Sequence, residues 1–201
     1  MKMVYLGNLN KNLLRFVCEI KDDGCESFAF TDVAVVSEKA FASSDMKQVV
    51  FEDTLATIKK EAFKDCEELR VFCCGKLSSE TKIEKETESN EKDEKNNVLA
   101  ESIIKGLGIY DASSDFVVET SAFAGCEKLH TVILPKCKTL KIEKGAFAEC
   151  SSLRTVIALS DKIEFTENPF GDCLKDLTFI CKSGSGVERF SRENGYRYVN
   201  V

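Results

Sequence analysis

Residues 122–135 read AFAGCEKLHTVILP, and residues 146–158 read AFAECSSLRTVIA. The two stretches agree at Ala, Phe, Ala, Cys, Leu, Thr, Val and Ile when they are aligned 24 positions apart. A unit of this length is too short to bury its own apolar residues, so neighbouring units must stack to form a continuous core. The repeated phrase therefore predicts a solenoid.

The repeat continues through most of the chain when it is anchored on its phenylalanine. The anchors are Phe41, Phe63, Phe123, Phe147 and Phe170, at spacings of 22, 60, 24 and 23 residues. Three positions after the anchor stands Cys66, Cys126, Cys150 or Cys173, with Ser44 in the first unit. The spacing of 60 corresponds to one unit plus an insertion. Several positions that recur together over five units indicate a genuine repeat.

A β-branched stretch with period-two alternation occurs once in each unit, after the repeated Leu where the unit has one. These stretches are Lys47–Phe51, Arg70–Cys74, His130–Leu134 and Arg154–Ala158. In His130–Leu134 the alternation sends Val132 and Leu134 inward and leaves Thr131 and Ile133 outward. Stacked units would pair these stretches as parallel strands about 4.8 Å apart. We expect a repeat solenoid of the α/β class, mostly β, with a parallel β-sheet face.

The unit L-x-x-V-x-L-P…I-x-x-x-A-F-x-x-C-x-x-L resembles the BspA-like leucine-rich repeat. It is carried by Leu129, Val132, Leu134, Pro135, Ile142, Ala146, Phe147, Cys150 and Leu153. The stretch LTFICKSGSGVERFSRENGYRYV (177–199) is similar to that family's end unit, a strand, a short helix and a final strand. Ser185 and Glu188 form a capping-box pattern for that helix, and Gly195 stands where it should stop.

The resemblance implies a right-handed leucine-rich-repeat coil that serves as a module for protein recognition. Members are often adhesive, at the surface of bacteria or protozoan parasites. The expected organisation is a degenerate first repeat and N-terminal cap (1–35), leucine-rich repeats (36–176) and a C-terminal capping repeat (177–201). Residues 76–97 are charged and almost devoid of apolar side chains, so we expect a mobile insertion at about 76–112. A partner-binding tail is the alternative for that segment.

Composition narrows the function classes. The net charge is −6 and Lys and Arg nowhere gather in a basic stretch, which disfavours nucleic acid as partner. No apolar run approaches the roughly 20 residues that span a bilayer, so no membrane insertion is expected. Gly7 and Asn8 interrupt any apolar segment of a secretory signal. We therefore expect a cytoplasmic protein with reduced cysteines, while the family resemblance adds the cell surface as an alternative.

The sequence predicts no enzyme and no cofactor. Its single histidine, His130, occupies the slot that Arg70 and Arg154 fill in sister units, which indicates an exposed substitution and not a catalytic base. The repeated cysteines should spread along the stack as small hydrophobic residues, because a zinc site needs sulfurs that converge on one point. A metal- or redox-responsive protein remains the alternative reading of these ten cysteines.

The outward side chains of the strands are the candidate partner-binding residues. Exposed apolar residues with a polar rim mark interaction sites, although they can also serve only to stabilise strand pairing. The candidates are Val50, Val71, Cys73, His130, Thr131, Ile133, Arg154, Thr155 and Ile157, flanked by Lys47 and Arg70. We expect a non-catalytic protein–protein interaction module, or alternatively a surface adhesin. The partner's identity and the oligomeric state stay open, with a monomer favoured.

Overall fold

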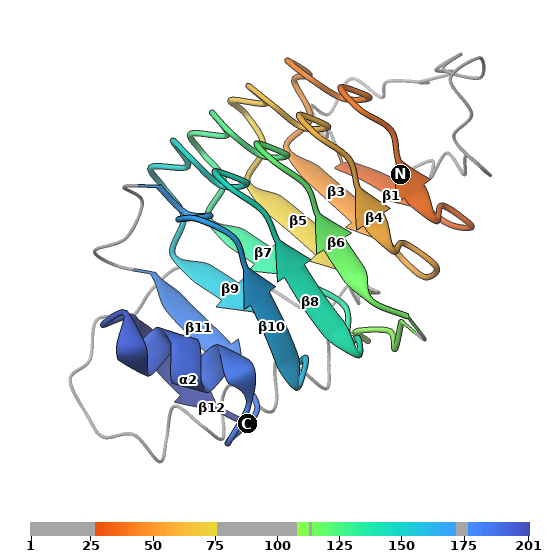
Figure 1. Ribbon diagram of the computed structural model, residues 1–201. Helices are drawn as coiled ribbons and strands as arrows, with labels where there is room; N and C mark the ends of the chain where they lie inside the picture. Colours follow the sequence, from red (N-terminus) through yellow and green to blue (C-terminus); the bar gives the residue numbers. More distant parts are fainter. Residues whose placement is uncertain (1–26, 76–107, 113, 172–176) are drawn as a thin grey trace.

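The computed structural model describes residues 27–75, 108–112, 114–171 and 177–201 and shows a coil with two parallel β-sheets (Figure 1). The seven-stranded sheet contains, in spatial order, β1 (Ser27–Phe30), β3 (Gln48–Phe51), β5 (Val71–Cys74), β7 (Thr131–Ile133), β9 (Thr155–Ile157), β11 (Thr178–Cys181) and β12 (Arg197–Asn200). The five-stranded sheet contains β10 (Lys162–Phe165), β8 (Thr139–Ile142), β6 (Phe116–Val118), β4 (Thr57–Ile58) and β2 (Val35–Val36). The predicted parallel solenoid is confirmed.

The register of the seven-stranded sheet follows the predicted alternation. Val49, Phe72, Val132 and Val156 are paired from strand to strand, and all four are completely buried in the main core. The residues on either side of this column point away from that core. This column, in register across the sheet, therefore gives the stack its continuous apolar interior, and Phe51 and Cys74 add a second inward pair in β3 and β5.

The five-stranded sheet was not predicted. Its strands have only two to four residues, which is too short to show a strand pattern in the sequence. These short strands form because the stacked turns hold one another in register. Even the two-residue strand Thr57–Ile58 pairs with a strand on each side. The sequence does carry one signal for these strands, an aliphatic or aromatic residue five positions before each anchor Phe: Val36, Ile58, Val118, Ile142 and Phe165.

The anchor phenylalanines form a continuous stack through the middle of the coil. Successive ring centroids are 5.1 Å apart for Phe41 and Phe63, 5.0 Å for Phe63 and Phe123, 5.1 Å for Phe123 and Phe147, and 5.4 Å for Phe147 and Phe170. The interplanar angles are 13°, 2°, 5° and 9°, so the rings are nearly parallel. Offset-stacked aromatic rings attract each other beyond their burial of apolar area, which favours an identical residue in every unit.

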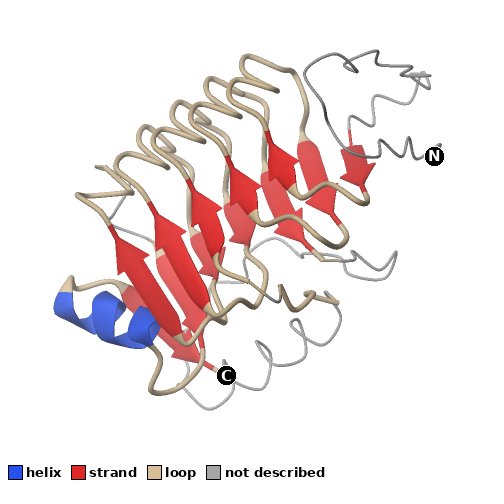
Figure 2. Cartoon of the chain, turned by 45° about the vertical axis from the view of Figure 1, so that its right-hand side comes forward, coloured by secondary structure: helices blue, strands red, loops and turns tan. Residues whose placement is uncertain are grey.

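The C-terminal unit closes the stack as expected. Its helix α2 (Gly186–Glu193) connects β11 to β12 along the chain and lies at the end of the coil (Figure 2). The Ser185 hydroxyl accepts a hydrogen bond from the Glu188 N–H at 3.3 Å, and Gly195 follows the helix with φ +74°. In a capping box the Glu188 carboxylate would accept the backbone N–H of Ser185. Here it accepts the N–H of Gly184, one residue earlier. Phe190 and Tyr196 pack on the last core aromatics, including Phe179.

The division of the chain into caps and repeats stays a prediction. Residues 1–26 and 76–107, which carry most of the expected N-terminal cap and the charged insertion, lie outside the described residues. Where the description resumes, Asp111 forms a parallel bridge with Lys136, and Tyr110 donates a hydrogen bond through its hydroxyl to the Leu55 carbonyl at 2.9 Å. Residues 109–112 are thus tied to two neighbouring turns.

Candidate interaction surface of the seven-stranded sheet

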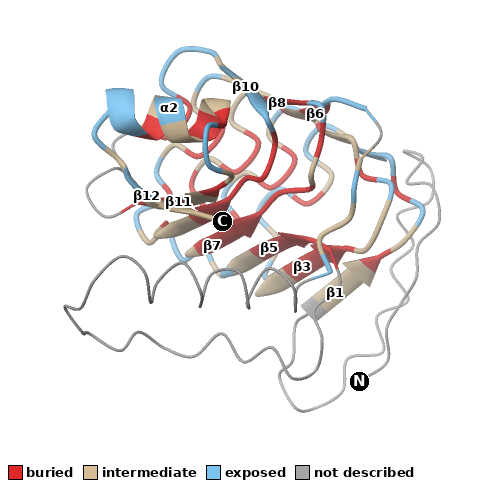
Figure 3. Ribbon diagram, turned by 90° about the horizontal axis from the view of Figure 1, so that it is seen from below, coloured by how far each residue is buried: buried red, intermediate tan, exposed pale blue. Residues whose placement is uncertain are grey.

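The outward residues of the sheet form a second hydrophobic cluster, which we call the outer cluster: Val50, Cys73, Ile133, Ile157 and Leu159. Their direction away from the main core agrees with the sequence prediction, but their expected exposure is wrong. Cys73 and Ile133 are 0% exposed, Ile157 is 2% and Val50 is 7% exposed. Thr131, at 8%, is also buried. Figure 3 shows how much of this sheet is buried.

Two physical reasons account for this burial. Neighbouring outward residues are directly paired, Cys73 with Ile133 and Ile133 with Ile157, and such cross-strand pairs remove each other's apolar surface from water. Residues from other parts of the chain, Ile109 and Val201, also pack against the cluster. The outer cluster is therefore a second core and not a free apolar surface.

The accessible side chains lie before the outer cluster along each strand, at the strand's first residue or just ahead of it. Val71, His130, Arg154 and Thr155 are partly exposed and Arg70 is exposed. The residue before each strand forms a line that we call the rim column: Lys47, Arg70, His130 and Arg154. Its backbone is joined by hydrogen bonds from Arg70 N to Lys47 O (2.8 Å), His130 N to Arg70 O (3.0 Å) and Arg154 N to His130 O (3.1 Å).

His130 is half-buried at the centre of the rim column and was expected to be exposed. Its Nδ1 lies 2.8 Å from the Thr131 hydroxyl oxygen. Burial lowers the pKa of His130 below its usual 6.5, and the positive charge of Arg70 lowers it further. The imidazole is therefore neutral at pH 7, and it can gain a proton when a negative charge approaches.

The repeated cysteines form hydrogen bonds between turns. The thiols of Cys66, Cys126 and Cys150 donate to the carbonyl oxygens of Phe41, Phe63 and Phe123 at 3.0, 3.0 and 3.1 Å. All seven described cysteines are free and buried. Contact with the Cys126 thiol and burial raise the pKa of Cys66, and burial raises that of Cys73 to about 12. Among the described residues, no three His, Cys, Asp or Glu side chains are grouped to hold a metal ion.

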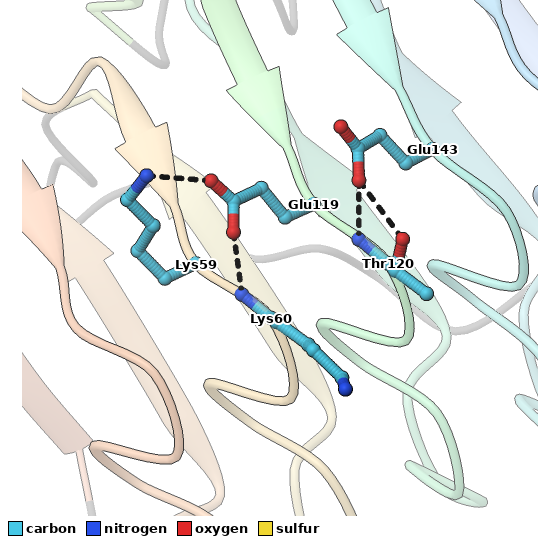
Figure 4. A network of polar contacts seen from close by, with 5 residues as sticks. All are labelled: Lys59, Lys60, Glu119, Thr120 and Glu143. Atoms are coloured by element: carbon cyan, nitrogen blue, oxygen red, sulfur yellow. Dashed lines mark hydrogen bonds and ion pairs between the residues drawn. The ribbon is translucent and has the colours of Figure 1, made fainter.

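A second set of polar contacts, which the sequence reading missed, follows the five-stranded sheet (Figure 4). The Glu119 carboxylate accepts from Lys59 Nζ at 2.6 Å and from the Lys60 N–H at 3.0 Å. One turn later the Glu143 carboxylate accepts from the Thr120 N–H at 3.0 Å and from its hydroxyl at 2.9 Å. Both carboxylates satisfy backbone of the preceding turn, so this network joins units and offers no catalytic pair.

Comparison with known proteins follows the same repeats. The family model described as "BspA type Leucine rich repeat region" matches residues 24–105 and 111–191, with six copies. No curated protein and no solved structure matches the chain. In the part of the chain that the structure describes, no helix has the length and apolar character needed to cross a membrane.

Proposed function

Because the chain belongs to the BspA type leucine-rich repeat family, we propose that it is a non-catalytic protein–protein interaction module. Leucine-rich repeats typically mediate such interactions, and a stack of repeats displays side chains of separate units on one extended surface. The observation that carries the proposal is the alignment of accessible side chains at the starts of β5, β7 and β9. Arg70, His130 and Arg154 stand in register there, next to Val71 and Thr155.

The proposed contact surface is narrower than the one expected from the sequence. Val71, His130, Arg154 and Thr155 keep the partner-binding role, together with Arg70. The outer cluster and Thr131 are excluded from the contact surface, because a buried side chain cannot contact a partner without displacing the residues that cover it. They stabilise the sheet beside the accessible residues. A rigid sheet beneath an accessible edge reduces the conformational entropy that is lost on binding.

A site-specific crosslink tests the proposal. A photoreactive residue at Thr155 should capture a discrete protein partner from native lysate under ultraviolet light. The matched control is the same residue at Lys144, which is exposed on the turn side of the five-stranded sheet and pairs with Glu167 at 2.8 Å. Adducts at position 155 alone support the proposal. Equal adducts at both positions, or none at either, contradict it.

The compartment is a separate part of the proposal. Proteins with this type of repeat are often surface-associated, and an adhesin would use the same surface for a host or matrix protein. We favour the cytoplasm, because every described cysteine is a free thiol and disulfides are rare where thiols are kept reduced. Labelling of intact cells with an impermeant biotin reagent decides between the two, since only a displayed protein is labelled.

A further inference from the structure

The rim column concentrates positive charge that is scattered along the sequence. Its four residues come from four successive units and precede β3, β5, β7 and β9. With strands about 4.8 Å apart, the column extends roughly 14 Å along one edge of the sheet. Only the fold brings these side chains together, which explains why no basic stretch is visible in the sequence.

Seven described lysines outside this column form ion pairs within the protein. Lys39 pairs with Glu61 at 3.3 Å, and Lys144 pairs with Glu167 at 2.8 Å. None of these ion pairs includes Arg70 or Arg154. No described carboxylate therefore lies within ion-pair distance of either arginine of the column.

The local carboxylates do not cancel this charge. Glu68 forms an ion pair with Lys128, and the pKa of Glu68 is lowered first by Lys128 and also by Arg70 and Lys47. One carboxylate thus faces three cations. Glu67 and Glu127 are exposed and stand three residues before Arg70 and His130 in the same repeat units. Arg154 is held along the sheet edge, because its Nη1 donates to the carbonyl oxygens of Ser151 and Leu153 at 3.1 Å each.

We propose that the rim column docks an extended acidic segment of the protein partner, whose Asp or Glu carboxylates pair with Arg70 and Arg154 on either side of His130. This inference rests on the proposed function. A guanidinium matches a carboxylate with two parallel hydrogen bonds. Arg70 and Arg154 are two strands apart, about 9.6 Å, and same-side carboxylates of an extended chain recur about every 6.8 Å, a difference that the long side chains span.

Protein is the class of partner that the charges favour. Nucleic acid binding depends on many simultaneous phosphate contacts, whereas this surface offers a few cations on a chain of net charge −6. His130 adds pH dependence, because a carboxylate placed beside it favours its charged form against the effects of burial and of Arg70. By linkage, the acidic segment should bind more tightly as the pH falls toward 6.

The chain's single histidine makes the test direct. The proton on Cε1 of His130 gives a single NMR signal, because the chain has no other histidine. The pKa of His130 is measured from this signal alone and with a ten-residue peptide of alternating Glu and Ser. Controls are the same peptide with Gln in place of Glu, and a single-stranded oligonucleotide of equal charge.

The acidic peptide should raise the His130 pKa. The double substitution R70Q/R154Q should weaken peptide binding about tenfold, because two charge contacts at the surface are lost. The matched variant R189Q, on the exposed side of α2, should bind like the parent.

The contrary results are equally specific. An unchanged His130 pKa in the parent chain at saturating peptide overturns the inference and needs no variant. Tighter binding of the oligonucleotide, or the same loss in R189Q, also overturns it. If crosslinking at Thr155 still captures a protein while the acidic peptide fails, the interaction module stands and only the acidic chemistry of its partner is wrong.

Discussion

The Cys126 thiol donates a hydrogen bond to the Phe63 carbonyl oxygen, which is 3.0 Å away and belongs to the preceding turn. The same bond recurs from Cys150 to Phe123. Cysteine combines a small apolar side chain with a hydrogen-bond donor in this slot. The Phe63 carbonyl oxygen also accepts the backbone N–H of Cys66, three residues later in its own turn, at 3.3 Å.

Replacing Cys126 with Ala should lower the free energy of unfolding by about 1–3 kcal/mol, because a buried contact and a hydrogen bond are both lost. Denaturant titration measures the change. Lys138→Ala, on an exposed residue of the same unit, is the control and should be neutral. A neutral Cys126→Ala would show that the thiol is dispensable.

Ile133 and Thr155 test the burial of the outer cluster. Ile133→Lys places a charge in a site that is 0% exposed, so it should cost at least about 3 kcal/mol of stability. Thr155→Lys, at a partly exposed position on the neighbouring strand, where Thr155 pairs with Thr131, should cost well under half as much. Thermal unfolding of the two variants gives the comparison. Equal stability of both would mean that the outer cluster is open to solvent.

This contrast shows how far the sequence alone could predict the surface. Period-two alternation correctly predicted that Val132 points into the main core and Ile133 away from it. Alternation gives only the side of the sheet, and the burial of Ile133 also depends on residues distant in sequence, such as Ile109 and Val201. His130 and Arg154 were among the predicted candidates, and both are accessible. Each stands just before a strand, at the edge of the sheet, and that position does not depend on which strand residues point inward.

Gly125 and Gly184 separate close packing from backbone conformation. Both have left-handed φ, +77° and +73°. A Cβ on Gly125 would lie 2.4 Å from the Asp65 Oδ1, whereas a Cβ on Gly184 would meet nothing within 4 Å. Gly125→Ala should therefore be less stable than Gly184→Ala by up to about 1 kcal/mol, because the exposed Asp65 side chain must leave its rotamer to make room. Similar losses in the two variants would contradict the close approach of these turns.

The pH dependence of stability should reveal His130. Its pKa is lowered in the folded protein, so the unfolded chain takes up the proton first as the pH falls below 6.5. Stability is full above that pH and decreases between it and the lower folded pKa. The carboxyl groups of Glu61, Glu68 and Glu167, whose pKa values are also lowered, act in the same direction only below about pH 4.5. Denaturant titrations at pH 7.5 and 5.5 should thus show a smaller decrease for His130→Gln than for the parent, and equal decreases would contradict this assignment.

Partner affinity tests the central claim most directly. With the protein captured through position 155 as ligand, calorimetry on the parent chain, R70Q/R154Q and R189Q measures whether the rim column makes the contact. We predict about tenfold weaker binding for R70Q/R154Q and parental affinity for R189Q. Parental affinity for R70Q/R154Q would contradict the claim that this protein binds its partner at the starts of the strands of its seven-stranded sheet.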